Sequence, residues 1–197
     1  MYTGRGQHVP KDVVSVQFDP SVTKVEDKAF DDCHNLREVV FNEGLKTIGN
    51  RGVFCGCSSL QSITMPSTLT EIGDGAFNSC SSLSKVVLND GLKKINQSAF
   101  DECRSLESIV LPSTLIEIGK KAFRHCRLLQ SISIPSIVTE LEDKAFDGCT
   151  GLRELVFRDG LKKIGYRAFA KCKALRSHQL LRRLMIMHFI VALIYGR

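Results

Sequence analysis

Apolar side chains recur along this chain with a spacing of 23 residues, and one unit has 24. Within each unit, phenylalanine, cysteine and leucine follow one another three residues apart, as in "AFNSCSSL" at 76–83. Two apolar residues separated by a single residue come next, and this alternation is the period of a β-strand. A turn with glycine or proline ends the strand. Two more apolar residues, three apart, complete a unit of short strands and tight turns.

The phenylalanines set the register of the repeat. They are Phe30, Phe54, Phe77, Phe100, Phe123, Phe146 and Phe169. A unit of 23 residues cannot bury its own apolar face, so neighbouring units must stack on one another. Val16 and Phe18 lie one period before Val39 and Phe41, which places the first unit close to the N-terminus. The pattern therefore predicts seven stacked units, called rungs below.

The repeat divides the chain into three regions. We expect an N-terminal flank at 1–12, the repeats at 13–176, and an irregular apolar segment at 177–197 that is either a cap or an atypical terminus. Within each rung, the stretch "AFxxC" is too short for a long helix and favours a single 3₁₀ or α turn.

A glycine follows the last apolar pair of most rungs, at Gly49, Gly73, Gly119 and Gly165. Asn96 takes this place in one rung, and asparagine tolerates the left-handed region better than most residues. The sequence therefore predicts a corner with positive φ at this position.

The full motif, L-x-x-I-x-(F/L/I) followed by L-x-x-I-G-x-x-A-F-x-x-C-x-x-L, runs from about Val13 to Leu175 and resembles the BspA-like leucine-rich repeats. The resemblance implies a leucine-rich-repeat solenoid of parallel β rungs, and a scaffold for protein–protein interaction that is not an enzyme. Some members of that family are adhesins with secretion signals, so a cell-surface adhesin is the alternative. The polar start "MYTGRGQHVP" has no apolar core of a signal peptide, and the default expectation is cytoplasmic.

Charge is distributed unevenly along the chain. Residues 1–115 carry a net charge of −3 and residues 116–197 a net charge of +9. A basic half of this kind can bind an anionic surface, so a membrane surface is an alternative partner; nucleic acid is not expected. The other interpretation is a solvated lysine and arginine surface with no partner. No stretch has the roughly 18 apolar residues of a membrane-spanning helix. The candidate basic residues are Lys120, Lys121, Arg124, Lys162, Lys163, Arg167, Lys171 and Lys173.

Seven of the eight cysteines occupy the same place in successive rungs. They are Cys33, Cys57, Cys80, Cys103, Cys126, Cys149 and Cys172. A free cysteine behaves as a small buried apolar residue with a weak S–H donor. Zinc needs ligands that converge on one point, whereas one cysteine per rung makes a line. We therefore expect a structural thiol ladder inside the stack.

Cys55 alone departs from this spacing. Its place directly after phenylalanine holds Asp31, Asn78 and Asp101 in other rungs, which predicts an exposed position. If any thiol is reactive, we expect it to be Cys55. The histidines share no place in the repeat, and no phosphate loop or metal motif occurs. The sequence therefore predicts no catalytic residue, no cofactor and no metal.

A regular strand face is the surface that solenoids offer to partners. The outward residues between the two strand positions are Val40, Thr64, Val87, Val110, Ser133 and Val156, and Lys85 and Glu154 belong to the adjoining row. We expect a protein or peptide ligand to bind here. The alternative is that β-branched residues are present only because they suit strands.

Overall fold

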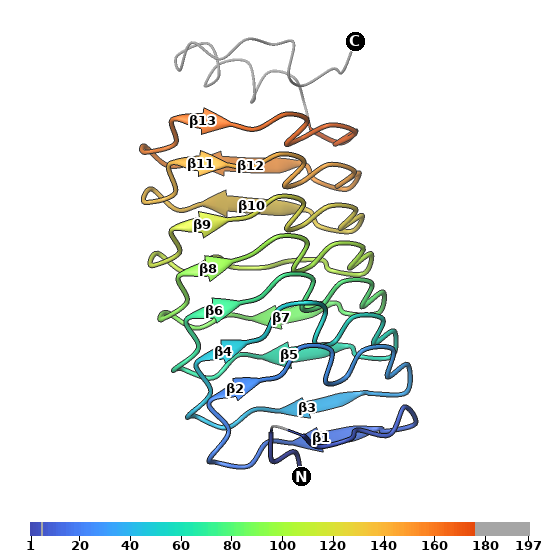
Figure 1. Cartoon of the computed structure of the whole chain (residues 1–197). Coiled ribbons are helices and arrows are strands. Elements are labelled where there is room, and N and C mark those ends of the chain that lie inside the picture. The colour runs from blue at the N-terminus through green and yellow to red at the C-terminus, as the bar shows by residue number, and fades with distance from the viewer. Residues whose placement is uncertain (5, 176–197) are drawn as a thin grey trace.

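A computed structural model of the chain describes residues 1–4 and 6–175. Figure 1 shows a stack of similar turns that rises from the N-terminus, with the strands of successive turns running parallel. Each rung holds a shorter strand and a loop of tight turns, and every rung but the fifth also holds a longer strand. The predicted solenoid of seven parallel β rungs is confirmed.

The shorter strands form one continuous wall, the short-strand wall. It is a parallel sheet of seven strands, one from each rung. Its strands are β2 (Lys24–Val25), β4 (Thr47–Ile48), β6 (Glu71–Ile72), β8 (Lys94–Ile95), β9 (Glu117–Ile118), β11 (Glu140–Leu141) and β13 (Lys163–Ile164). The second residue of every strand points into the core.

The longer strands form a second wall, the long-strand wall, whose pairing is discontinuous. Its strands are β1 (Ser15–Gln17), β3 (Glu38–Val40), β5 (Ser62–Thr64), β7 (Lys85–Val87), β10 (Ser131–Ile134) and β12 (Glu154–Phe157). They pair as β1–β3, β5–β7 and β10–β12, and a bridge joins Lys85 to Ser108 in the fifth rung. In β3, β5 and β7 the middle residue is buried and the residue on either side of it is exposed, as the period of two requires.

Stacked phenylalanine rings occupy the core between the walls and the turns. From Phe30 to Phe169, neighbouring rings have centroids 5.0–5.4 Å apart and planes within 10° of parallel. At the open N-terminal end, the Tyr2 ring packs 5.0 Å from Phe18 and 5.1 Å from Phe30. The Tyr2 N–H also donates to the Gln17 carbonyl, so the N-terminal flank covers the first rung.

The third side of the stack is the turn edge. It consists of seven loops, at 26–35, 49–59, 73–82, 96–105, 119–128, 142–151 and 165–174. The described residues form hydrogen-bonded turns here and no helix. In the third loop, Asn78 N–H bonds to the Gly75 carbonyl and Cys80 N–H to the Phe77 carbonyl. Gly75 and Ser79 have positive φ, at 62° and 60°, and these left-handed residues interrupt any helical turn.

The prediction of positive φ at the glycines that recur at the corner of most rungs is wrong. None of Gly49, Gly73, Gly119 and Gly165 has a positive φ. The left-handed residues of each rung begin two positions later, and another follows near the end of the loop. The reason for glycine is close approach between rungs. A Cβ on Gly73 would lie 2.3 Å from the Gly49 carbonyl oxygen, and a Cβ on Gly49 would lie 2.4 Å from the Val25 carbonyl oxygen.

The predicted apolar segment at 177–197 lies outside the described residues. Within the described residues, no helix is long and apolar enough to cross a membrane.

Candidate functional site

The outward row of the long-strand wall brings the predicted partner-binding residues together. Strand pairing sets Thr64 beside Val87 and Ser133 beside Val156. Lys85 in the adjoining row is exposed, as is Glu154. Four valines of the outward row remain largely open to solvent: Val40 (45% exposed), Val87 (41%), Val110 (83%) and Val156 (37%).

Beside this row, β3 and β5 lie next to each other without being paired, and we call the gap the β3–β5 seam. Elsewhere in the wall, Phe18 N–H donates to the Val40 carbonyl and Met65 N–H to the Val87 carbonyl, both at 2.9 Å. Phe41 N–H, at the equivalent place, makes no such bond among the described residues. The hydrogen-bonded ladder of the wall is therefore interrupted at this seam.

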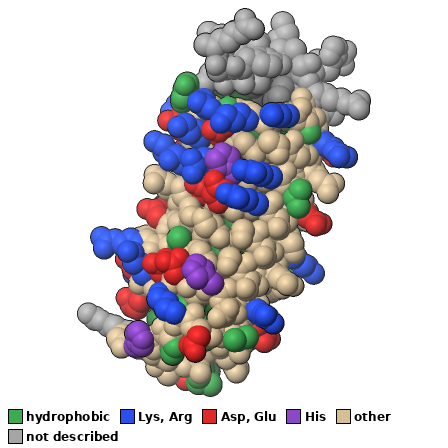
Figure 2. Space-filling model, turned by 90° about the vertical axis from the view of Figure 1, so that its right-hand side faces the viewer, with side chains coloured by type: hydrophobic (Ala, Val, Ile, Leu, Met, Phe, Trp, Pro, Cys, Tyr) green, Lys and Arg blue, Asp and Glu red, His purple; other side chains and the backbone are tan. Residues whose placement is uncertain are grey.

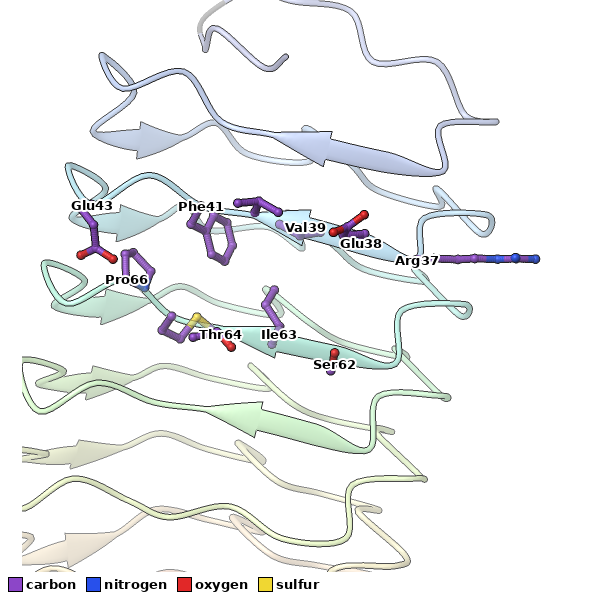
Figure 3. Close-up of a pocket in the computed structure, with 11 residues that line it drawn as sticks. Arg37, Glu38, Val39, Phe41, Glu43, Ser62, Ile63, Thr64 and Pro66 are labelled. Atoms are coloured by element: carbon purple, nitrogen blue, oxygen red, sulfur yellow. The ribbon is translucent and has the colours of Figure 1, made fainter.

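A pocket of about 360 Å³ occupies the β3–β5 seam. Phe41, Met65 and Pro66 supply apolar lining. The charged lining is Glu38, Glu43 and Arg37, so carboxylates outnumber the guanidinium by one. Figure 3 shows Phe41 and Pro66 beside the gap between the two rungs. The pocket is large enough for one apolar side chain, with negative charge at its rim.

The Glu43 carboxylate is held in place by the next rung. Its Oε2 accepts hydrogen bonds from the Ser67 hydroxyl at 2.7 Å and from the Ser67 N–H at 2.9 Å. These two bonds lower the pKa of Glu43, so the rim of the pocket is charged at neutral pH.

The periodic cysteines form the thiol ladder inside the stack. From the second rung onward, each thiol donates to the carbonyl of the phenylalanine one rung earlier, with sulfur–oxygen distances of 3.1–3.2 Å. In the first rung, Cys33 makes a longer contact of 3.9 Å with the Pro10 carbonyl. Burial raises the pKa of the thiols from Cys57 to Cys149, so they stay protonated and keep their donor role.

Cys55 is half-buried, and the prediction of an exposed position is wrong. The same place in other rungs holds Asp101 and Asp147, which are only 2% and 5% exposed. Asp101 and Asp147 belong to ion pairs with Arg124 and Arg167, so an acidic residue at this place does not indicate a solvated surface. Burial raises the pKa of the Cys55 thiol, and the charge of Asp31 adds to the effect. A thiol in this setting is a poor nucleophile.

One group of side chains has the composition of a metal site. The ligand atoms of Asp101, Glu102 and His125 lie within 4.8 Å of one another. Arg124 Nε, however, donates to both oxygens of Asp101, at 2.9 and 3.0 Å. Glu102 accepts from Arg104 Nε at 2.8 Å and lies 2.5 Å from His125 Nδ1. The carboxylates are already matched by side-chain cations, so the group is an ion-pair cluster.

The pKa values in this cluster follow from the same contacts. Burial raises the pKa of Asp101, although Arg124 opposes the shift. Burial acts in the same direction on Glu102, but hydrogen bonds from Arg104 and His125 outweigh it and lower the pKa of that carboxyl.

The basic residues predicted to bind an anionic surface do not form one patch. Lys163 lies in β13 of the short-strand wall and Lys162 directly before it, whereas the other six lie on the turn edge. Lys163 pairs with Glu140 and Arg124 with Asp101, so part of this charge is already neutralised. Figure 2 shows lysine and arginine gathered over the C-terminal half of the turn edge.

Comparison with known families explains the repeat. The sequence model of a family described as "BspA type leucine rich repeat region" matches residues 10–127 and 76–187, in six copies. The chain belongs to the BspA-type leucine-rich repeat family. The repeat fold of this family typically serves as a non-enzymatic scaffold. A search of curated proteins gave no match at the level of significance required.

Solved structures of this repeat family are similar to the chain. A leucine-rich repeat protein of T. pallidum is 33% identical, with a TM-score of 0.84, over 89% of this chain and 84% of that protein. A leucine-rich cell surface protein of Faecalibacterium prausnitzii is 26% identical, with a TM-score of 0.51, over 83% of this chain and 60% of that one. The pneumococcal vaccine antigen PcpA, 24% identical with a TM-score of 0.57, shares the fold over 83% of this chain and 49% of its own.

Proposed function

We propose that this chain is a repeat scaffold that binds a protein ligand along the outward row of the long-strand wall. The observation that carries the proposal is the alignment of four exposed valines in a single row. Isolated exposed apolar residues are normal on a protein surface, but here Val87 and Val110 are neighbours and Val40 and Val156 extend the same row beyond Thr64 and Ser133. Apolar residues gathered in this way are typical of an interaction site. The row is flanked by polar side chains such as Lys85 and Glu154, which give the contact a solvated rim.

The shape of the row indicates an extended ligand. Successive rungs offer one outward side chain about every 4.8 Å, so a peptide lying across the rungs meets several of them in turn. The rigid stack holds these side chains in place before binding, which lowers the entropy cost of association.

The pocket in the β3–β5 seam adds a specific anchor at the N-terminal end of the row. Phe41 and Met65 suit an aliphatic or aromatic side chain, and Glu38 and Glu43 suit a cation next to it. The proposed ligand is therefore an extended segment with an apolar residue beside lysine or arginine.

Selection from a displayed library of random peptides on the purified chain tests this function. We expect enriched peptides to carry an apolar residue next to a basic one. Replacing Val87→Glu together with Val110→Glu should reduce the affinity of a selected peptide at least about a hundredfold, because charged groups are then placed in the apolar contact. Affinity is measured by fluorescence anisotropy.

The matched control places glutamate at two exposed apolar positions outside the row. Ile116 and Ile137 are 45% and 49% exposed and lie near the short-strand wall. The Ile116→Glu and Ile137→Glu variant should bind as the parent does. Equal binding by both double variants, each with an unchanged melting temperature, would show that the row is not the site.

A second candidate function is a scaffold displayed at the cell surface. It is favoured by the 26% identity to a protein described as a leucine-rich cell surface protein. Protease treatment of intact cells that express the natural protein distinguishes the two settings. Degradation before lysis supports surface display, whereas protection until lysis contradicts it.

A further inference from the structure

The turn edge carries opposite charge at its two ends. In the first rung, the loop at 26–35 has a net charge of −3, from Glu26, Asp27, Asp31 and Asp32 against one lysine. In the last rung, the loop at 165–174 has a net charge of +3. The loops of rungs two to six carry +1, −1, −1, +4 and −2. The summed charge of rungs one to four is thus negative, and the summed charge of rungs five to seven is positive.

These charges are accessible at both ends. Glu26, Asp27 and Asp32 are exposed in the first loop, and Lys171 and Lys173 are exposed in the last. Figure 2, which faces this edge, shows blue side chains gathered in the upper part and few of them below. The separation is therefore a property of the surface, and the edge as a whole has an electric dipole along the stack.

The buried ion pairs of this edge do not cancel the difference. Arg124 neutralises Asp101 at 2.9 Å, and Arg167 lies 3.7 Å from Asp147. Each of these pairs joins a basic residue of one rung to an acidic residue of the rung before it. Among the described residues, Lys120 and Lys121 of the fifth rung form no salt bridge, so the upper half stays basic.

The net charges of the loops, read from the first rung to the seventh, are mostly opposite in sign to the same series read in reverse. If a second copy lies against this edge with its stack reversed, and the two-fold axis passes through the fourth rung, the first rung meets the seventh, the second meets the sixth, and the third meets the fifth. The net charges that meet are −3 with +3, +1 with −2, and −1 with +4. Only the fourth rung, at −1, meets its own sign. This self-complementary arrangement is the requirement of a two-fold interface.

We propose that two copies of this chain associate antiparallel through their turn edges, with the fourth rung on the two-fold axis. Opposite charges face each other along most of the contact, which favours this register over a parallel one. Tyr166 and Leu128, which are 59% and 51% exposed on the same edge, add apolar surface in the basic half. The association leaves the long-strand wall open on both copies.

Sedimentation velocity of the full chain tests for the dimer. At about 20 mM salt we expect a dimer, and at about 500 mM salt we expect the dissociation constant to rise at least about tenfold, because salt screens exposed charges. A monomer at low salt and high protein concentration would overturn the proposal.

Paired charge reversals test the register. Lys171→Glu with Lys173→Glu should abolish the dimer, and Glu26→Lys with Asp32→Lys should do the same. The Asp32 change is tolerated by the fold, because Lys171 already occupies the equivalent place with the same positive φ. Combining all four changes restores opposite charge at both ends, so the dimer should return.

The combined variant also separates this proposal from an anionic ligand on the basic half. If the basic half instead binds anionic vesicles, binding is lost in the variant with Lys171→Glu and Lys173→Glu and does not return in the combined variant. Vesicle binding with this pattern, without a dimer that returns, would contradict self-association as the function of this edge. Lys46→Glu with Lys93→Glu, two exposed residues off the edge, gives the same change in net charge and should leave the dimer intact.

Zero-length cross-linking gives a direct readout. Carbodiimide joins carboxylates to amines only at contact distance, and the first and last loops of one copy are roughly 29 Å apart along the stack. A cross-link between the loops at 26–35 and 165–174 must therefore join two copies. Cross-links between first loops and other loops alone would show a different register.

Discussion

Two neighbouring columns of side chains run the length of this molecule and differ in how strictly they repeat. The phenylalanine column is the same residue in all seven rungs, whereas the residue directly after it changes at every step. That second column reads Asp31, Cys55, Asn78, Asp101, Arg124, Asp147 and Ala170. The two differ by a single residue in sequence, so backbone position alone cannot explain the contrast.

The contrast follows from what each side chain touches. A phenylalanine ring packs against identical rings in both neighbouring rungs, so a change of size disturbs two contacts at once. In the second column a residue needs only a compatible partner one rung away, as Asp101 has in Arg124. Stacking on identical rings therefore requires phenylalanine in every rung. In the second column, a contact with one partner requires only that the two residues suit each other.

The largest expected effect on stability is that of Phe100→Ala, in the middle of the phenylalanine column. Removing a fully buried ring leaves a cavity between two rungs, and we expect a loss of about 3–5 kcal/mol in the free energy of unfolding. Asn78→Ala, in the second column, should change that free energy by about 0.5 kcal/mol or less. Urea unfolding followed by circular dichroism measures both. Similar losses in the two variants would contradict the distinction.

The thiol ladder predicts a loss of stability at alkaline pH. Burial raises the pKa of the Cys103 thiol above that of an unfolded cysteine, which is about 8.5. Above that pH the unfolded chain releases the proton while the folded chain keeps it, so the free energy of unfolding falls as pH rises. At neutral pH, below both pKa values, this contribution to stability is fully present.

Cys103→Ala isolates the contribution of one thiol. Between about pH 9 and 10, its free energy of unfolding should fall less steeply than that of the parent, by about 1.4 kcal/mol per pH unit at most. Lysines and tyrosines titrate equally in both proteins, so the difference in slope reports the thiol. Identical slopes would mean that the Cys103 thiol ionises as easily in the fold as outside it.

The stack was predictable because every rung repeats the same packing problem. Phenylalanine, cysteine and leucine at constant spacing leave one solution, and the seven rungs follow from it. The ion pair between Asp101 and Arg124 could also be predicted, because the two residues are 23 apart and so lie in neighbouring rungs. Cys55 was expected to be exposed because Asp101, at the same place in its rung, is charged; the ion pair explains why that inference is wrong.

Other features depend on geometry that residue type does not encode. The left-handed turn residues include Lys121, Ser98 and Arg167, which carry no sequence signal for positive φ. Glycine at Gly73 is needed for close approach to the rung before it, which looks the same in sequence as a need for positive φ. The pocket of the β3–β5 seam lies where two strands do not pair, and the repeat places the same kinds of residue there as where strands do pair.

The smallest expected effect makes the sharpest comparison, because the chemistry of the substitution is identical. Cys80→Ala removes a buried thiol whose sulfur lies 3.1 Å from the Phe54 carbonyl, and we expect a cost of about 1–2 kcal/mol from the small cavity and the lost donor. Cys55→Ala removes a half-buried thiol whose contact with Asn78 is 3.9 Å long, and it should cost about 0.5 kcal/mol or less. Urea unfolding at pH 7 resolves the difference. Equal costs would mean that the second column is packed as tightly as the thiol ladder.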